Sequence, residues 1–158
     1  MTRPAFEEIY LNLAADLARR SSCTRLQVGA VITSWDFTEV FSVGYNGNAA
    51  KLPNGCDSPT PGACGCLHAE DNAALKCAAP RSESKVVFVT DLPCVMCAKR
   101  LINLGGVARV LYEREYRITT GIDTLVSAGI RVERWGRVGG AAVLRDISQR
   151  TITETGST

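Results

Sequence analysis

The sequence predicts one α/β domain, because segments with apolar residues at helical spacing alternate with short runs rich in valine and isoleucine. A chain of 158 residues, of which 46% are hydrophobic, is long enough to enclose one core. The formal net charge is +2 without a run of lysine or arginine, which disfavours nucleic acid as a partner. No segment is apolar over a membrane-spanning length and the N-terminus lacks a signal-peptide pattern, so we expect a cytoplasmic protein with no membrane partner.

The elements follow in order along the chain. A helix is predicted over 6–19, where apolar residues recur at helical spacing after a proline. Strands over 28–33 and 40–45 are expected to form a hairpin through a turn at 34–38. The further elements predicted are helix 67–78, strand 85–90, helix 94–104, strand 107–112, a helix near 120–128 and strand 130–135.

Two stretches are less regular. A loop rich in glycine, proline and cysteine covers 47–66. Towards the C-terminus the periodicity is weak, with a short last helix expected over 145–149 and a frayed end over 151–158. We therefore expect a domain over 1–136, followed by a partly flexible extension over 137–158.

The segment His68-Ala69-Glu70, followed downstream by Pro93-Cys94-Val95-Met96-Cys97, carries the chemistry. His68, Cys94 and Cys97 are zinc-suited ligands, and a catalytic zinc site uses three protein ligands and leaves the fourth position to water. The carboxylate of Glu70 has no ligand duty and is placed to move protons. This pattern is the signature of zinc-dependent nucleoside and nucleobase deaminases.

The predicted helices explain why this spacing works. His68 and Glu70 fall in the first turn of one helix, and Cys94 and Cys97 are three residues apart on one face of the next. Pro93 suits a helix entrance, and thiolates form more easily at a helix N-terminus. Zinc lowers the pKa of its bound water towards roughly 7. Attack of this water at an amidine-like carbon gives a carbonyl and ammonia, which is hydrolytic deamination.

A lone C-x-x-C is also typical of a structural zinc site or a redox pair. A redox role explains neither His68 nor Glu70. A structural site would more naturally use four protein ligands and needs no neighbouring carboxylate. Because the only histidine of the chain lies inside the motif, we favour catalytic zinc.

The resemblance extends beyond the zinc motif. Gln27-Val-Gly-Ala-Val-Ile, Gly44-Tyr-Asn-Gly, His68-Ala-Glu-Asp-Asn-Ala and the Pro-Cys-x-x-Cys-Ala segment within 90–98 resemble the deoxycytidylate (dCMP) deaminases of the cytidine deaminase superfamily over roughly residues 5–135. The resemblance implies a three-layer α/β/α cytidine-deaminase-like fold with a central five-stranded mixed sheet. It also implies conversion of dCMP to dUMP for thymidylate synthesis, a homo-oligomer (hexamer or dimer), and regulation by dCTP and dTTP.

The same resemblance implies roles for single residues. His68, Cys94 and Cys97 match the zinc ligands, and Glu70 matches the proton shuttle. Asn46 matches an asparagine that holds the substrate's sugar, although an asparagine between tyrosine and glycine is also a common turn residue. A backbone group of Ala69 would meet the pyrimidine edge.

A 5′-phosphate requires cations or backbone amides. Arg25, just before the first predicted strand, is a candidate for bidentate contact, with a solvated loop arginine as the alternative. The segment after the strand at 107–112 lies at the sheet edge where ligands collect. There Tyr112 or Tyr116 could stack on the base, and Arg114 or Arg117 could reach the phosphate.

The seven cysteines are odd in number and clustered as metal ligands are, which predicts a reducing compartment and not a disulfide scaffold. Cys23, Cys56, Cys64 and Cys66 could close a second, structural zinc site that orders the long loop. Some phage dCMP deaminases hold such a zinc there, partly with histidines that this chain lacks. The alternative is a set of small buried thiols, with Cys77 as one of them.

Two rival functions remain open. The enzyme could act on another cytosine nucleotide, a nucleoside, a modified dCMP or a base in tRNA. If the protein is not an enzyme, the alternative is a zinc-stabilised accessory protein of deaminase-like fold. Glu70 disfavours this alternative, because a structural zinc does not require the carboxylate. One departure from the family pattern bears on regulation. Asn48-Ala49-Ala50 follows the Asn-Gly turn where these deaminases commonly have a proline, in the loop that helps form their effector site.

Overall fold

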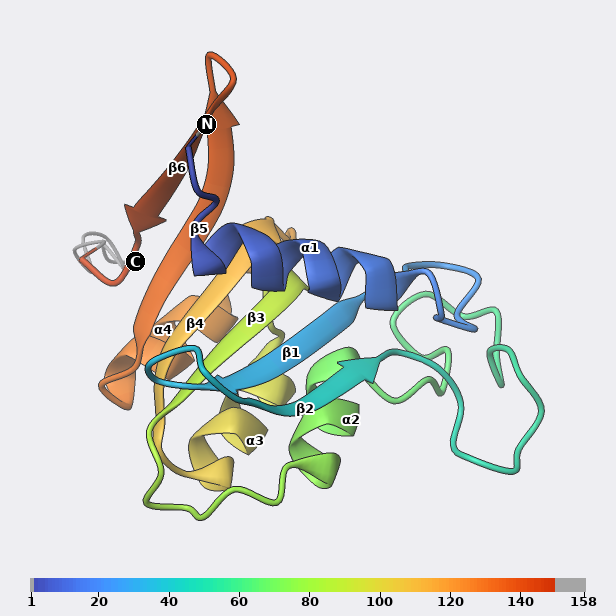
Figure 1. The fold of residues 1–158 in the computed structure, drawn as a ribbon. Helices are drawn as coiled ribbons and strands as arrows, with labels where there is room; N and C mark the ends of the chain where they lie inside the picture. The colour runs from blue at the N-terminus through green and yellow to red at the C-terminus, as the bar shows by residue number, and fades with distance from the viewer. Residues whose placement is uncertain (1, 150–158) are drawn as a thin grey trace, which may run out of the picture.

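The computed structural model describes residues 2–149 and shows a mixed sheet between two layers of helices (Figure 1). The sheet has the strand order β2-β1-β3-β4-β5-β6. β3 and β4 are parallel, as are β4 and β5, and the other neighbouring pairs are antiparallel. The elements are α1 (Phe6–Ala18), β1 (Gly29–Ser34), β2 (Val40–Tyr45), α2 (Ala69–Lys76), β3 (Lys85–Asp91), α3 (Val95–Leu104), β4 (Val107–Arg114), α4 (Thr120–Ser127), β5 (Arg131–Val138) and β6 (Ala141–Asp146).

Each face of the sheet has its own hydrophobic core. On one face, α1 buries Tyr10, Leu11 and Ala14 against side chains of β1, β3 and β4. On the other face, α2, α3 and α4 pack on the same strands through a larger cluster that includes Ala73 and Leu101. The central strands β1 and β3 are buried throughout, which explains their continuous apolar runs. The α/β class with three layers is confirmed.

Within residues 2–149 the sheet has six strands, where five were expected. The short helix expected over 145–149 is wrong, because Arg145 and Asp146 lie in β6, which pairs antiparallel with β5. Gly139 and Gly140 both have positive φ and form the two-residue turn that joins these strands.

This hairpin also bears on the expected domain boundary. Residue 136 lies inside β5, so the sheet continues past the limit expected for the domain. The frayed end expected over 151–158 lies outside the described residues. Within residues 2–149, no helix combines the length and the apolar character needed to cross a membrane.

The topology brings the predicted metal ligands and Glu70 together at the edge of the sheet where β3 ends. The chain leaves the C-terminal end of β3 at Asp91 and reaches Cys94 three residues later. α2 packs on β2 and β1, and its first turn lies beside the start of α3. Two helix N-termini that come from distant parts of the sequence therefore meet at this edge.

Candidate zinc-dependent active site

Three side chains of the predicted motif lie together at the starts of α2 and α3. His68 is the N-cap residue of α2 and Cys94 that of α3. His68 Nδ1 lies 3.3 Å from Cys97 Sγ and 3.7 Å from Cys94 Sγ. Tetrahedral zinc bound at usual Zn–S and Zn–N lengths needs sulfur–nitrogen separations of about 3.5 Å. Two thiolates and one imidazole are soft donors, so this cluster fits zinc in both chemistry and spacing.

The start of α3 is held by its own capping residue and by α4. Cys94 Sγ accepts a hydrogen bond from the backbone N–H of Cys97 at 3.4 Å, as an N-cap side chain does. Gly121 in the first turn of α4 lies against the carbonyl of Pro93, where any Cβ would overlap the carbonyl oxygen. The close approach of α4 thus fixes the turn that presents the cysteine ligands.

The start of α2 is fixed on β2 in a similar way. Gly44 leaves room for the carbonyl of Ala69, which a Cβ at that position would strike. The Asn72 side chain donates a hydrogen bond to the Tyr45 carbonyl at 2.9 Å. Gly44 of the Gly-Tyr-Asn-Gly motif and Asn72 of the His-Ala-Glu-Asp-Asn-Ala motif therefore both help to dock α2 on β2.

Glu70 lies in the first turn of α2 and is only 4% exposed. Burial raises the pKa of its carboxyl to about 7, well above the ordinary value of a glutamate. The neighbouring thiol behaves in the opposite way, because a hydrogen bond from Cys97 and another from His68 lower the pKa of Cys94 to about 3. A buried carboxyl beside thiol and imidazole groups that suit a metal is the arrangement that acid–base catalysis at a metal site requires.

Asn46 is buried just after β2, and its side chain bonds to the backbone of the segment before β1. Its Oδ1 accepts from the Val28 N–H at 2.8 Å, and its Nδ2 donates to the Leu26 carbonyl at 2.6 Å. One hydrogen on Nδ2 and one lone pair on Oδ1 remain for other partners. The predicted sugar contact stays a prediction, and the observed role is to hold two chain segments together.

The other substrate candidates are placed differently from one another. Tyr112 is fully buried in the core under α2–α4, so stacking of this ring on a base is not possible in this structure. Arg114 pairs with Asp91 at 2.8 Å and donates to the Gln27 carbonyl at 3.1 Å, so its guanidinium is already engaged.

Three candidates keep exposed side chains, and one is buried. Arg25 precedes β1, and Tyr116 and Arg117 follow β4, all at the surface. Ala69 is fully buried as the first residue of α2, and its contact with the pyrimidine edge stays a prediction.

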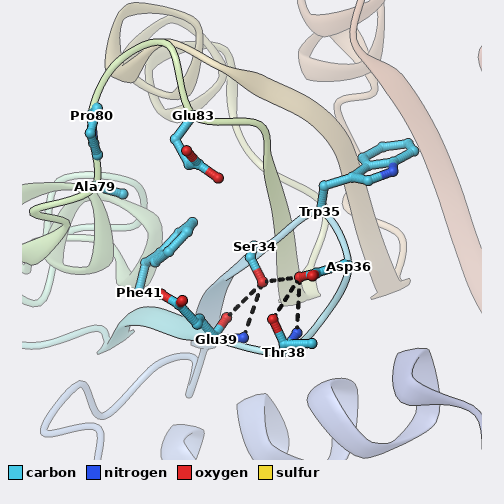
Figure 2. Close-up of a pocket in the computed structure, with 9 residues that line it drawn as sticks. All are labelled: Ser34, Trp35, Asp36, Thr38, Glu39, Phe41, Ala79, Pro80 and Glu83. Carbon is cyan, nitrogen blue, oxygen red and sulfur yellow. Dashed lines mark hydrogen bonds between the residues drawn. The ribbon is translucent and has the colours of Figure 1, made fainter.

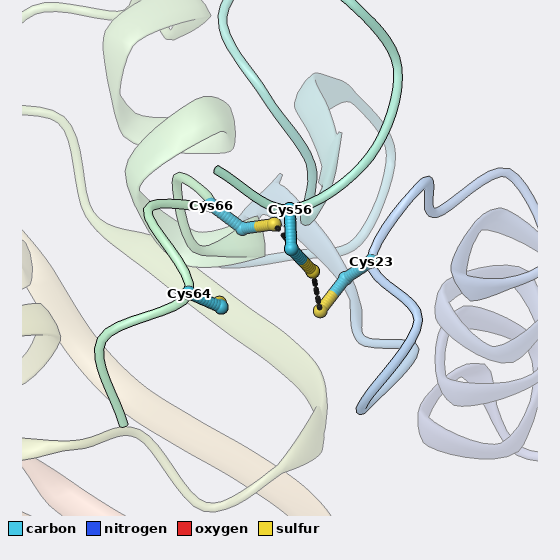
Figure 3. Close-up of side chains that lie close together, drawn as sticks. All are labelled: Cys23, Cys56, Cys64 and Cys66. Carbon is cyan, nitrogen blue, oxygen red and sulfur yellow. Dashed lines mark hydrogen bonds between the residues drawn. The ribbon is translucent and has the colours of Figure 1, made fainter. Parts of the chain in front are cut away.

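The four remaining loop cysteines form a second cluster, shown in Figure 3. The sulfurs of Cys23 and Cys56 lie 3.6 Å apart, as do those of Cys56 and Cys66. With Cys64, all four sulfurs lie within 4.8 Å of one another. A tetrahedral zinc bound by four thiolates requires sulfur–sulfur separations of about 3.8 Å.

The second cluster joins loop segments that are far apart in sequence. The hydroxyl of Thr24 lies 3.6 Å from the sulfur of Cys56 and lowers the pKa of that thiol to about 7, which favours the thiolate form. Gly47 and Leu67 form an isolated antiparallel bridge at the base of the loop. Cys77 takes no part in the cluster and packs against the core at the end of α2.

A separate hollow of about 570 Å³ lies beside the turn between β1 and β2 (Figure 2). Ser34, at its wall, pairs with Lys85 at the start of β3, whereas Cys94 follows the opposite end of that strand. The hollow shares no residue with either cysteine cluster and takes no part in the site. It is lined by Ser34, Trp35, Asp36, Thr38, Glu39, Phe41, Ala79, Pro80 and Glu83.

Comparisons with known proteins agree with this geometry. Residues 4–114 match the cytidine and deoxycytidylate deaminase zinc-binding region. The deoxycytidylate deaminase of Mycobacterium phage D29 is 34% identical over 130 residues, which cover 73% of this chain and 99% of the phage protein. The crystal structure of dCMP deaminase from cyanophage S-TIM5 superposes with a TM-score of 0.73 at 33% identity, over 85% of this chain and 99% of that one.

The chain therefore belongs to the cytidine and deoxycytidylate deaminase family, and the resemblance found in the sequence is confirmed. A eukaryotic relative is longer. The deoxycytidylate deaminase of Saccharomyces cerevisiae is 31% identical over 147 residues, which cover 85% of this chain but only 46% of the yeast protein. The chain thus spans about half the length of that relative and nearly all of the phage proteins.

Proposed function

We propose that this protein catalyses the hydrolytic deamination of dCMP to dUMP and ammonia and supplies dUMP for thymidylate synthesis. The observation that carries the proposal is the three-ligand cluster of His68, Cys94 and Cys97 with the buried Glu70 beside it. The related cyanophage enzyme was crystallised with dCMP and dUMP, which supports this nucleotide as the substrate.

The residues of the site divide the work. His68, Cys94 and Cys97 would hold zinc, which would act as a Lewis acid and make water nucleophilic at neutral pH. The water oxygen forms a bond to C4 of the base, while Glu70 takes up one water proton and passes it to N3. The second proton of that oxygen then passes by way of Glu70 to the exocyclic amine at C4. The C4–N bond then breaks, ammonia leaves, and a carbonyl remains at C4. Burial of Glu70 keeps solvent from competing for these protons.

Substrate orientation is proposed to use residues around this centre. Asn46 would contact the sugar, and the backbone of Ala69 would meet the pyrimidine edge. Arg25 is the preferred phosphate contact because its side chain is exposed, whereas Arg114 is held by Asp91. Tyr116 remains a candidate for stacking on the base, with 48% of its surface exposed.

The test is ammonia release from dCMP, CMP, deoxycytidine, dCTP and cytosine, with and without dCTP or dTTP as effectors. Turnover confined to dCMP is the expected result. Turnover of an unphosphorylated nucleoside would instead favour another branch of the family. If zinc-bound protein releases no ammonia from any of the five compounds, this result would favour a modified or polymeric substrate, or a non-catalytic accessory role.

The second metal centre belongs to the same proposal. Cys23, Cys56, Cys64 and Cys66 would hold a structural zinc, since four thiolates close the coordination shell and leave no position for water. Metal analysis should then find two zinc ions per chain. One ion per chain would refute the second site.

Assembly, regulation and location complete the proposal. A homo-oligomer, hexamer or dimer, regulated by dCTP and dTTP is proposed from the family resemblance. The reducing cytoplasm is the proposed location, because two clusters of metal-binding thiols keep their ligands only where cysteines stay reduced. Light scattering of the purified protein with and without dCTP tests the assembly.

A further inference from the structure

An ion pair that is buried only on its carboxylate side connects the two helices that carry the zinc-suited side chains. Asp71 follows Glu70 on α2, and its side chain is only 10% exposed. Its Oδ2 accepts a hydrogen bond from Arg100 Nη1 of α3 at 2.9 Å. Its Oδ1 lies 3.8 Å from the sulfur of Cys97, close enough to accept from the thiol. The carboxylate of Asp71 therefore touches both a zinc ligand and a cation on the facing helix.

The charges at this contact have a definite consequence. Cys97 binds zinc as a thiolate, and a carboxylate beside it repels that negative charge. Arg100 offsets the carboxylate, and its own side chain is half exposed, so its positive charge is solvated at low cost. Without the arginine, a nearly buried carboxylate would face the sulfurs of the site with no compensating charge.

The ion pair also ties α2 to α3, the two helices whose first turns carry the zinc-suited side chains. Arg100 lies three residues after Cys97, about one turn further along α3, so both residues lie on the side of α3 that faces α2. Groups that contact metal ligands from outside orient those ligands, and their loss commonly lowers metal affinity about 10- to 100-fold. Packing of α2 and α3 on the sheet does not depend on the pair, because Ala73 and Leu101 are buried in the core.

We propose that Asp71 and Arg100 are positioning residues for the zinc ligand Cys97. Arg100 offsets the charge of the Asp71 carboxylate, so that this carboxylate can lie beside the zinc-binding thiolate without weakening zinc binding. The inference deepens the proposed function and rests on its zinc site, but it does not depend on which nucleotide the enzyme uses.

The experiment compares the zinc affinity of four proteins by competition with a chromophoric chelator: the parent, R100Q, D71N and the double variant D71N/R100Q. If zinc is released from the two sites in two separate steps of the titration, the step of the catalytic site is identified as the one that is absent in Cys94→Ala protein. R100Q should bind zinc at least about 10-fold more weakly than the parent. The double variant should regain most of this loss, because the unbalanced carboxylate is gone. Lys99→Gln, on the same helix and exposed, is the matched control and should leave the affinity unchanged.

Two outcomes would overturn the proposal: R100Q that binds zinc as tightly as the parent, or a double variant as weak as R100Q. A pair that served only the fold would lower the unfolding temperature without this recovery of affinity. R100K, which keeps the charge, should retain an affinity closer to the parent and provides a second test if R100Q folds poorly. Because no substrate is present, failure of dCMP turnover would not alter the result.

Discussion

The two clusters of zinc-suited side chains differ in what holds them and in what surrounds them. His68, Cys94 and Cys97 stand at the starts of two helices packed on the sheet. The cluster of Cys23, Cys56, Cys64 and Cys66 joins loop segments. The first offers three donors and a buried carboxyl, and the second offers four donors.

The number of donors and their surroundings distinguish a catalytic metal site from a structural one better than the types of ligand residue do. Cysteine supplies most of the donors in both clusters, so composition alone does not distinguish them. Under the proposed function, an open coordination position and Glu70 would make the first cluster reactive, while the packed helix starts hold its geometry. The second cluster closes a long loop whose ordering a metal can stabilise. Loss of one zinc should therefore abolish activity, and loss of the other should mainly reduce stability.

The largest effect is expected from Cys94→Ala. This change removes a ligand of the three-donor cluster, so zinc content should fall from two ions per chain to one and turnover should vanish. The unfolding temperature should change far less, because the helices remain packed on the sheet. Metal analysis, an ammonia assay and calorimetry on the same sample measure all three quantities.

Cys77→Ala is the matched control for that experiment, since Cys77 lies at the end of α2 outside both clusters. It should keep two zinc ions and full turnover. A Cys94→Ala protein that still holds two zinc ions would show that the ligand assignment is wrong.

Glu70→Gln separates the chemical step from metal binding at the same site. The amide keeps the shape of the side chain but neither accepts nor donates the transferred proton, so turnover should fall roughly 10²- to 10⁴-fold. Zinc content and unfolding temperature should match those of the parent. Single-turnover assays with dCMP measure the rate. Full activity in this variant would contradict the proton-transfer role.

Cys56→Ala tests the other side of the comparison. Cys56 lies between Cys23 and Cys66, so its loss should release the second zinc and free the loop. A loss of several kcal/mol would lower the unfolding temperature of a domain of this size by about 10 °C. At low temperature the protein should keep most of its activity and one zinc ion. Equal losses of activity in Cys56→Ala and Cys94→Ala would remove the functional distinction between the two clusters.

How far the sequence predicts this structure depends on the range of the interactions involved. The helix start at Cys94 was predictable, because its capping contact acts within one turn, whereas His68 at the start of α2 makes no side-chain capping hydrogen bond. The hairpin of β5 and β6 was missed although its Gly139-Gly140 turn is a local signal. The weak apolar alternation of β6 is explained by its mostly exposed side chains.

Contacts between distant segments were the least predictable. Tyr112 was expected at the ligand edge, but the alternation of side chains along β4 turns it into the core. The pairing of Arg114 with Asp91 depends on the parallel register of β3 and β4, in which these two residues are partners. Asp71 and Arg100 gave no local signal, because their pairing depends on how closely α2 approaches α3.

Arg25→Gln is expected to have the smallest effect and asks whether the segment beside the four-cysteine cluster also serves the active site. Arg25 lies two residues after Cys23 and is exposed before β1. If its guanidinium binds the 5′-phosphate, the KM for dCMP should rise about 10-fold or more, as loss of a charged hydrogen bond implies. The kcat and both zinc ions should be retained. Arg117→Gln, at the other exposed arginine considered for the phosphate, should leave the KM unchanged if Arg25 is the contact. An unchanged KM for dCMP would make Arg25 a solvated loop residue and confine the role of that segment to metal binding.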